Sequence, residues 1–383
     1  MSVQPPTVAV VGVGTMGALA FWQLAERGIR VIGYESRTPA HPASAGAGGS
    51  RMFREVTTDG AALDVQTGHA RALWERLAAR SGDDLIVPTG ALSVGSSDSA
   101  LVRGSIASAE RRGVPHQILS PAEIEARFPL RAHTDGEVGV YEPGAATIRS
   151  DAAVIAAARL GVAAGGELRT HTAVTAIESR GSGVRVHSLT AGDARADDVD
   201  AVIVSAGTGT AGVIPGAGRW VEPRHTATHV WFPIEDETLL VPGRLPATVR
   251  DLGGGDRFGA MPALDGRNLK IGAHRHTAPD AMTAAELEAD GIDAATELVR
   301  AHFDGVVPFP VAARSYTESY ALAGSAVVDW IDGPDSRQVV MAGFSGIGFK
   351  RAPALAAHAV AMVLGETADP PNGHAWADAP HIR

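Results

Sequence analysis

The sequence predicts an α/β protein of two domains, one of them a doubly wound, Rossmann-like domain that binds a dinucleotide. Three observations support this fold class. The 383 residues suit about two hydrophobic cores, because one core serves roughly 100–200 residues. The composition, 45% hydrophobic and 20% charged, is that of a globular chain. A buried strand at Val8–Val11 runs directly into the glycine pattern Gly12-x-Gly14-x-x-Gly17.

The first elements form a βαβ unit. A helix over Ala18–Arg27 follows the glycine pattern and ends at Gly28. A second strand covers Val31–Tyr34 and leads into Glu35. Residues 36–50 are rich in Pro, Ala and Gly and predict a long loop. Together these segments supply the first half of a dinucleotide-binding fold.

The rest of the chain alternates helices and strands. The capping box Ser120-Pro121-Ala122-Glu123 marks one helix start. The other predicted elements are helices at Ala62–Arg80, Asp151–Ala164, 283–303 and through Leu364, strands at Leu85–Val94 (broken at Gly90), Val199–Ser205 and Gln338–Ala342, and a hairpin of Leu168–Ile177 with Val184–Leu189.

Segments typical of a dinucleotide-binding fold lie at the start, in the middle and at the end of the chain. We therefore predict a discontinuous cofactor-binding domain of residues 1–84, 145–218 and 321–383. The remaining residues, 85–144 and 219–320, are predicted to form the substrate domain.

Composition and charge exclude several classes of function. The chain has no cysteine, which excludes disulfides, cysteine-bound zinc, iron–sulfur clusters and thiol catalysis. Its net charge is −10 and its basic residues do not run in blocks, so we expect no nucleic-acid partner. No segment resembles a signal peptide or a membrane span, so we expect a cytoplasmic protein without membrane contact. His225 with His229, and His274 with His276, lack the pattern of a metal site, and we predict no metal.

The glycine pattern has a physical role in holding a dinucleotide. Gly12 permits a tight turn, Gly14 lets the backbone approach a pyrophosphate, and Gly17 allows the helix to pack closely against the strand. The helix N-terminus presents N–H groups to the phosphates. Glu35 lies 23 residues after Gly12 at a strand end, where its carboxylate can accept hydrogen bonds from ribose hydroxyls.

Three further glycine-rich turns favour FAD over NAD. They are Ser44–Arg54, with the sequence SAGAGGSRMFR, Val199–Gly207 and Gly343–Gly348. FAD carries two phosphates, a ribityl chain and a tricyclic ring, so it needs several close approaches of the backbone. The predicted cofactor-binding residues are Gly12, Gly14, Thr15, Met16, Gly17, Glu35, Gly49, Ser50, Arg51, Val174, Ala206, Gly207, Gly343, Gly346, Gly348 and Lys350.

At these residues the chain resembles the FAD-dependent amine oxidases of the D-amino-acid-oxidase superfamily. The nearest branch contains monomeric sarcosine oxidase and N-methyltryptophan oxidase. The resemblance runs nearly end to end, and its segments are VVGVGTMG (10–17), GGSRMFR (48–54), TGALSVG (89–95), EPGAATIRSDA (142–152), VIVSAGTGT (202–210), NLKIGAHRH (268–276), SYTES (315–319) and MAGFSGIGFK (341–350). It implies that the substrate domain is built on a large mixed β-sheet that covers the flavin.

The resemblance also implies roles for single residues. Arg54 and Lys350 would bind the substrate carboxylate, and Lys270 would activate oxygen on the flavin face opposite the substrate. Arg51 would lie beside the flavin, and Tyr316 and His274 would line the pocket. Of the 33 lysine and arginine residues only Lys270 and Lys350 are lysine, and both fall on these positions.

The chain departs from the family at several positions. The cysteine that carries a covalent flavin in the family corresponds to Arg314, so we expect non-covalent FAD. The family's active-site tyrosine and two of its histidines correspond to Gly259, Ile347 and Ala47. This loss of large or polar groups favours a substrate that is bulkier and more apolar than sarcosine. The alternative is that other side chains, such as His276 or Phe258, refill the space.

The predicted function is that of a monomeric oxidase of an α-amino acid or an N-alkyl or cyclic amino acid. A hydride would pass from Cα to flavin N5 to give an imine, and O2 would then reoxidise the flavin to give H2O2. Two alternatives are a dehydrogenase with another electron acceptor and a flavin-binding protein without turnover. Lys270 argues against the first, and the retained cluster of Arg51, Arg54, Lys270 and Lys350 argues against the second.

Overall fold

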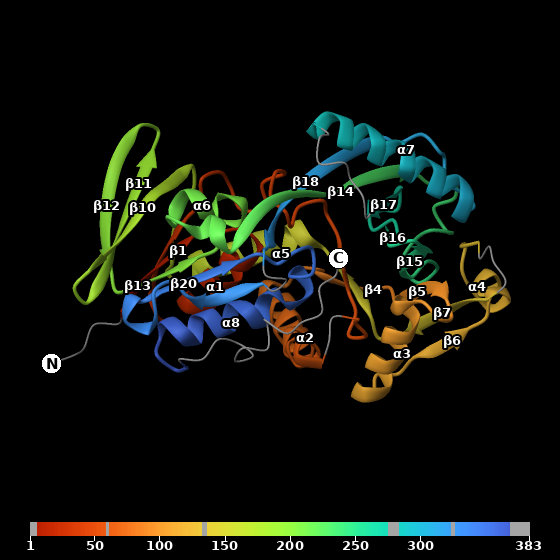
Figure 1. Cartoon of the computed structure of the whole chain (residues 1–383), viewed down its shortest axis with the longest axis horizontal. Coiled ribbons are helices and arrows are strands. Elements are labelled where there is room, and N and C mark those ends of the chain that lie inside the picture. Colours follow the sequence, from red (N-terminus) through yellow and green to blue (C-terminus); the bar gives the residue numbers. More distant parts are fainter. Residues whose placement is uncertain (1–5, 59–60, 132–135, 275–282, 323–325, 368–383) are drawn as a thin grey trace.

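A six-stranded sheet organises one half of the molecule (Figure 1). The computed structural model describes residues 6–58, 61–131, 136–274, 283–322 and 326–367. The strands are, in spatial order, β19 (Val327–Trp330), β20 (Gln338–Ala342), β13 (Ala201–Val204), β1 (Thr7–Val11), β2 (Arg30–Tyr34) and β9 (Glu167–Arg169). All neighbours run parallel except β19, which pairs antiparallel with β20. This arrangement confirms the predicted Rossmann-like βαβ start.

The two faces of this sheet are covered differently. One face packs on the helices α1 (Thr15–Glu26), α5 (Ser150–Ala163) and α8 (Ala352–Val363), and α2 (Ala61–Ser81) packs on α5 and α8. The other packs on a three-stranded sheet of β10 (Thr172–Arg180), β11 (Gly183–Thr190) and β12 (Asp193–Val199). The alternation of a strand explains this, because Val8 and Val10 belong to the helix-side core while Ala9 and Val11 belong to the other core.

An eight-stranded sheet organises the other half. Its spatial order is β18 (Ala312–Ala321), β14 (Val221–Pro233), β17 (Asn268–His274), β16 (Asp256–Met261), β15 (Ala247–Gly253), β5 (Ala91–Ser96), β7 (Glu137–Glu142) and β6 (Gln117–Leu119). The sheet is mixed, because β15 pairs parallel with β5 and the other neighbours pair antiparallel. The large mixed sheet expected from the resemblance is therefore confirmed.

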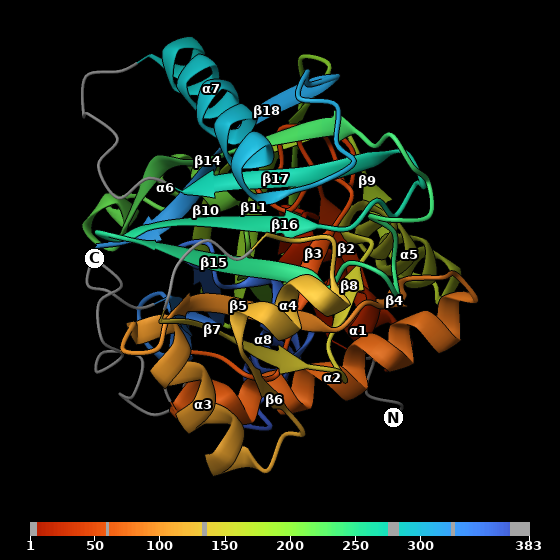
Figure 2. The same cartoon turned by 90° about the vertical axis from the view of Figure 1, so that its right-hand side faces the viewer.

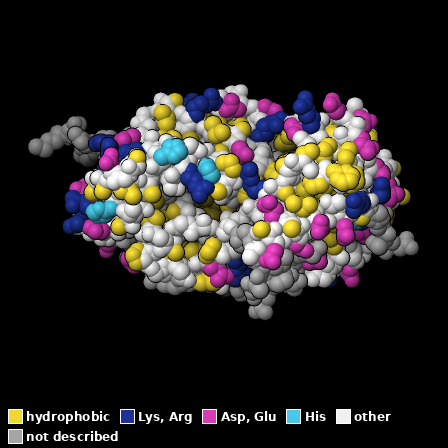
Figure 3. Space-filling view, turned by 90° about the horizontal axis from the view of Figure 1, so that it is seen from above, with side chains coloured by type: hydrophobic (Ala, Val, Ile, Leu, Met, Phe, Trp, Pro, Cys, Tyr) yellow, Lys and Arg dark blue, Asp and Glu magenta, His cyan; other side chains and the backbone are white. Residues whose placement is uncertain are grey.

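Helices cover this sheet at its two ends (Figure 2). The helix α7 (Ala284–His302) packs on β14, β17 and β18, and the helices α3 (Ala100–Arg112) and α4 (Pro121–Arg127) pack on β7. The capping box predicted at Ser120 is present, with Glu123 as its second member. Seen from above, acidic and basic side chains are interspersed on the surface (Figure 3).

A small sheet of β3 (Arg51–Phe53), β8 (Ala146–Ile148) and β4 (Ile86–Pro88) completes the strands. The short helical segments are α6 (Thr210–Val213) and the 3-10 turns η1 (Gly207–Gly209), η2 (Ala217–Arg219), η3 (Pro334–Ser336) and η4 (Phe349–Arg351). Within the described residues, no helix combines the length and the apolar character needed to cross a membrane.

Two predicted strands are each divided in the structure, the first of them at the predicted break at Gly90. The run Leu85–Val94 is two strands in different sheets, because Gly90 takes a φ of +67° and lets the chain turn between β4 and β5. The run Leu168–Ile177 is also divided, since His171 takes a φ of +52°. Leu168 thus belongs to β9, and the hairpin is formed by β10 and β11 alone. The domain ranges given above stay a prediction.

Candidate functional site

A cavity of about 900 Å³ lies at the carboxyl ends of β1, β2, β13 and β20. The strand β1 lies between β2 and β13. The strands that follow β1 in the sequence are therefore added on both sides of it, first β2 and β9 on one side and then β13 and β20 on the other. Open α/β sheets bind ligands at such a switch point. The wall comes mainly from residues within 11–16, 34–46, 172–174, 205–213, 315–319 and 341–349.

Two glycines of the turn at this cavity, Gly12 and Gly17, have no room for a side chain. Gly12 has a φ of +85°, and a Cβ added there would lie 2.6 Å from the Ser205 carbonyl oxygen. A Cβ on Gly17 would lie 1.8 Å from the Gly12 carbonyl oxygen, so α1 can approach β1 only with glycine there. A Cβ on Gly14 would meet only the Ser44 hydroxyl, at 3.7 Å. The backbone at Gly14 is therefore open to a phosphate group, as FAD requires.

Glu35 directly follows β2 and lines the same cavity. One carboxylate oxygen accepts a hydrogen bond from the Val13 N–H at 2.9 Å, and the other accepts from the Arg37 N–H at 2.9 Å. These bonds fix the carboxylate between the glycine turn and the loop that follows β2. An acidic group in this position is suited to the ribose hydroxyls of a dinucleotide.

The cavity collects most of the predicted cofactor-binding residues. Those that line it are Gly12, Gly14, Thr15, Met16, Glu35, Arg51, Val174, Ala206, Gly207, Gly346 and Gly348. Those that do not are Gly17, Gly49, Ser50, Gly343 and Lys350. Gly17 acts instead through the close packing of α1 on β1.

One wall of the cavity was not predicted from the sequence. Thr317, Glu318 and Ser319 line it from β18, a strand of the other large sheet. The segment Ser36–His41 also contributes, within the long loop that was predicted. Thr317, Glu318 and Ser319 belong to the SYTES segment, which carries part of the family resemblance. Nothing in the local sequence indicates that β18 reaches the cofactor cavity.

Two basic side chains meet at the loop 45–50. Lys270 on β17 is only 5% exposed, and its ammonium donates to the carbonyl oxygens of Gly48, at 3.2 Å, and Ser50. Arg51 donates to the carbonyl oxygens of Ser50 and Ala45, both at 2.9 Å. Burial, with a smaller contribution from the Arg51 charge, lowers the pKa of Lys270 well below its usual value. Arg51 lines the cavity, whereas Lys270 lies behind the loop and does not.

Tyr316 adds an aromatic ring to this cluster. The Arg51 guanidinium lies 5.7 Å from the centre of the Tyr316 ring, and Tyr316 is 3% exposed. Burial raises the pKa of Tyr316, and the Arg51 charge opposes that shift. Gly48 has a φ of +105°, and a Cβ there would lie 2.5 Å from the Tyr316 hydroxyl oxygen. Only glycine therefore lets Tyr316 approach the loop.

His274 was predicted to line the pocket, and His276 was an alternative for filling its space. The backbone of His274 ends β17, but its side chain lies outside the described residues, and so does all of His276.

The predicted substrate-binding residues do not border the 900 Å³ cavity. Arg54 follows β3, and its guanidinium donates to the Ser93 hydroxyl at 2.7 Å. Lys350 lies in η4, where its carbonyl oxygen accepts from the Trp74 indole N–H at 3.0 Å. Gly259 is in the middle of β16, and an added Cβ there would meet only the Thr248 carbonyl oxygen, at 3.9 Å. Ile347 is partly buried in the turn after β20.

The fold and the cavity define a dinucleotide-binding enzyme with a second, mixed sheet. The chain belongs to the family of FAD dependent oxidoreductases, which it matches over residues 7–362. FAD is thus the cofactor, and the predicted resemblance is confirmed. The chain is 28% identical to monomeric sarcosine oxidase from Streptomyces avermitilis, with 95% of each chain covered. It is 27% identical to N-methyl-L-tryptophan oxidase from Citrobacter koseri, with 94% of this chain and 92% of the relative covered.

Solved structures agree on the fold. NikD, described as an unusual amino acid oxidase, superposes with a TM-score of 0.81 at 22% identity, covering 95% of both chains. Glycine oxidase from Geobacillus kaustophilus superposes with a TM-score of 0.72 at 21% identity, covering 94% of this chain and 95% of that one. The predicted combination of a Rossmann-like domain with a large mixed sheet is therefore confirmed.

Proposed function

We propose that this protein is an oxidase of an α-amino acid or an N-alkyl or cyclic amino acid, with O2 as the electron acceptor and H2O2 as a product. The observation that carries the proposal is the buried ammonium of Lys270, bonded to the Gly48 and Ser50 carbonyl oxygens beside Arg51. FAD, when bound, accepts a hydride from the substrate and passes electrons to O2. The relatives' names, sarcosine oxidase and N-methyl-L-tryptophan oxidase, support the same class of substrate.

Lys270 stabilises the negative charge that develops when O2 accepts an electron. An ammonium has three donors, and within the described residues two of them bind carbonyl oxygens, which leaves the third for a water or for the reacting group. A fixed cation in a dry site stabilises such a charge without reorganising solvent. Arg51 keeps the loop 45–50 in place through the Ala45 and Ser50 carbonyl oxygens.

Arg54 and Lys350 bind the carboxylate of the substrate. Both are cations, and charge-assisted hydrogen bonds to a carboxylate are about twice as strong as neutral ones. Holding the carboxylate fixes the Cα–H bond toward the flavin and excludes other orientations. Gly259 leaves open space at β16, and Ile347 is apolar, which supports a side chain larger than that of sarcosine.

FAD is bound without a covalent link in this proposal. The chain has no cysteine, and Arg314 stands where the family carries its linkage. Arg314 on β18 contacts the long loop of residues 36–50, since its guanidinium donates to the Pro42 carbonyl oxygen at 3.4 Å.

A substrate screen tests the proposal directly. Amino and imino acids are mixed with the holoenzyme under nitrogen, and bleaching of the flavin identifies substrates. Air is then admitted and peroxide is measured. We expect bulky apolar amino or N-alkyl amino acids to bleach the flavin faster than sarcosine, and each turnover to yield one H2O2. Bleaching without peroxide in air would favour the dehydrogenase, and no bleaching by any amino acid would contradict both.

A further inference from the structure

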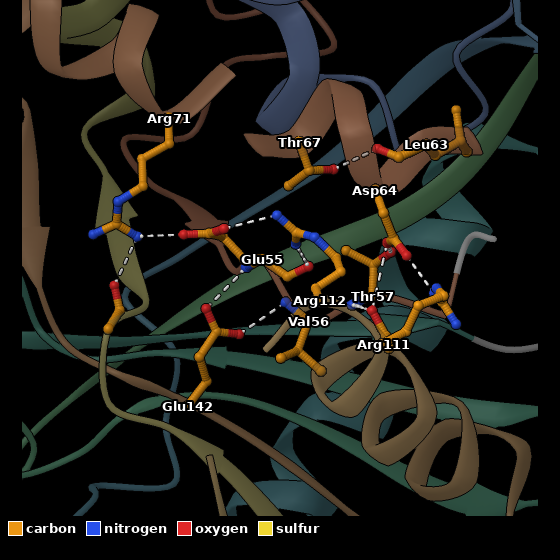
Figure 4. A network of polar contacts seen from close by, with 12 residues as sticks. Glu55, Val56, Thr57, Leu63, Asp64, Thr67, Arg71, Arg111, Arg112 and Glu142 are labelled. Carbon is orange, nitrogen blue, oxygen red and sulfur yellow. Dashed lines mark hydrogen bonds and ion pairs between the residues drawn. The ribbon is translucent and has the colours of Figure 1, made fainter. Parts of the chain in front are cut away.

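The segment that follows Arg54 is held by side chains along its backbone (Figure 4). The N–H groups of Glu55 and Val56 donate to the two carboxylate oxygens of Glu142, at 2.9 and 3.0 Å. The next N–H, of Thr57, donates to the Ser108 hydroxyl at 3.2 Å. Three consecutive N–H groups thus bind side chains from other elements. This fixes the direction in which the chain leaves Arg54.

The same carboxylate is close to the Arg54 side chain. Glu142 is 2% exposed at the end of β7, and β7 pairs with β5, which carries Ser93. Ser93 lies opposite Val140, so Ser93 and Glu142 occupy diagonal positions on one face of the sheet. Ser93 accepts from the Arg54 guanidinium. The two strands therefore hold both the backbone beside Arg54 and its charged end.

The other side of the segment is tied to two helices. The Glu55 carboxylate pairs with Arg71 of α2 at 3.2 Å and with Arg112 of α3 at 2.8 Å. Arg112 also donates to the Glu55 carbonyl oxygen at 2.6 Å. These cations pair with Glu55, and Glu142 is a second carboxylate whose charge interacts with that of Arg54. Burial raises the pKa of Glu142 above its usual value, with a smaller contribution from the Glu55 charge, and the two N–H bonds and the Arg54 charge oppose that shift.

We propose that Glu142 is a positioning residue for substrate binding, which together with Ser93 sets the direction of the Arg54 guanidinium and so the affinity for a carboxylate ligand. This inference rests on the proposed role of Arg54. Glu142 does not touch the substrate. It acts by fixing the backbone of Glu55 and Val56 and by facing the positive charge of Arg54 with a buried negative one.

The test compares two buried glutamates of the same strand. Glu142→Gln keeps the shape, but its amide NH2 faces an N–H group that needs an acceptor. Glu137→Gln is the matched control, because Glu137 is also buried on β7 but points to the opposite face and pairs with Arg250. Both are measured as holoenzymes, with benzoate and the uncharged benzamide as ligands and flavin absorbance as the signal.

We expect Glu142→Gln to raise the Kd of benzoate by roughly tenfold or more, as for the loss of a charge-assisted bond, and to leave the Kd of benzamide unchanged. With substrate, KM should rise more than kcat falls. Glu137→Gln should lower the melting temperature without changing either Kd. Ser93→Ala should also weaken benzoate binding. In the double variant with Glu142→Gln, the loss of benzoate binding free energy should be smaller than the sum of the two single losses, because both residues act through Arg54.

The outcomes separate this inference from the proposed function. If Arg54→Met weakens benzoate binding but Glu142→Gln does not, the inference fails and the carboxylate role of Arg54 stands. If Glu142→Gln weakens benzoate and benzamide equally, its role is merely structural and the inference also fails. If Arg54→Met leaves benzoate binding intact, both fail. Should Glu142→Gln not fold, Glu142→Asp is measured in its place, and unchanged benzoate binding would overturn the inference.

Discussion

Lys270 and Arg54 carry their charges in different surroundings. Lys270 is bonded to two carbonyl oxygens in a buried position, and burial lowers its pKa. Arg54 is partly buried, is bonded to Ser93 and lies near the Glu142 carboxylate. An ammonium concentrates its charge on one nitrogen, whereas a guanidinium spreads its charge over a planar fork. This difference suits Lys270 to a charge that develops during reaction and Arg54 to a permanent carboxylate.

Lys270→Met should slow only one half of the reaction. We expect reduction by substrate under nitrogen to proceed normally and reoxidation in air to be at least roughly 100-fold slower, because one preorganised donor to a developing negative charge is lost. Stopped-flow absorbance of the flavin measures the two halves separately. Lys270→Arg serves as the control and should recover part of the rate. Reoxidation at the wild-type rate in Lys270→Met would remove the residue from the oxygen reaction.

Arg54→Met and Lys350→Met should each weaken substrate binding. A hydrogen bond to a charged group contributes about 1.5–3 kcal/mol, so we expect kcat/KM to fall roughly 10- to 150-fold. Steady-state peroxide formation measures the effect. An amine that lacks the carboxylate should be a poor substrate of the wild type, and its kcat/KM should change little in either variant. An equal loss of kcat/KM for the amino acid and for the amine without a carboxylate would argue against a carboxylate-binding role.

At the scale of elements, the contact between β1 and α1 decides whether the cofactor site forms. The helix begins directly at the glycine turn, and residues 16–25 of α1 are buried. Its N-terminus therefore faces the cavity, where it can stabilise a phosphate. Any side chain that pushes the helix away from the strand moves these N–H groups as well.

Gly17→Ala should therefore reduce both stability and FAD content. The added Cβ would lie 1.8 Å from the Gly12 carbonyl oxygen, and overpacking of this kind costs about 1–3 kcal/mol. Thermal unfolding and the ratio of flavin to protein absorbance measure the two effects. Gly144→Ala is the control, since a Cβ there meets nothing within 4 Å and its φ is not positive. A Gly17→Ala protein with full FAD content would show that α1 can retreat without cost.

At the scale of the whole molecule, the cofactor cavity is shared between the two large sheets. Its wall includes Gly12 and Gly14 from the six-stranded side and Thr317, Glu318 and Ser319 from β18 of the eight-stranded sheet. Enclosure from two sides can retain a large cofactor through many weak contacts, without a covalent bond.

Denaturation should consequently release the flavin completely. Without cysteine, and with Arg314 at the position of the family's linkage, we expect acid or heat precipitation to leave all yellow colour in the supernatant. The absorbance of the supernatant and of the washed, redissolved pellet measures the distribution. Colour that stays with the pellet would contradict the proposal and would point to a bond through another side chain, such as histidine.

The sequence alone was enough to predict the βαβ start, the glycine turn and the acid at the end of β2. These features depend on residues within about thirty positions of one another, where spacing and backbone conformation express themselves locally. The sequence was also enough to identify the family, because the matching segments extend along nearly the whole chain. It failed at His171, where a positive φ divides the run Leu168–Ile177 between strands of different sheets. The break at Gly90 was predicted, but the sequence did not indicate that β4 and β5 belong to different sheets.

Only the tertiary structure decided how the distant parts meet. Lys270 binds the Gly48 carbonyl oxygen across 222 positions of the chain, and Glu142 binds the Glu55 N–H across 87. Neither contact leaves a periodic signal, because each depends on the order of strands within a sheet and on which face a side chain occupies. That order of strands places Lys270 behind the loop 45–50. It also brings Ser93 of β5 and Glu142 of β7 close to Arg54.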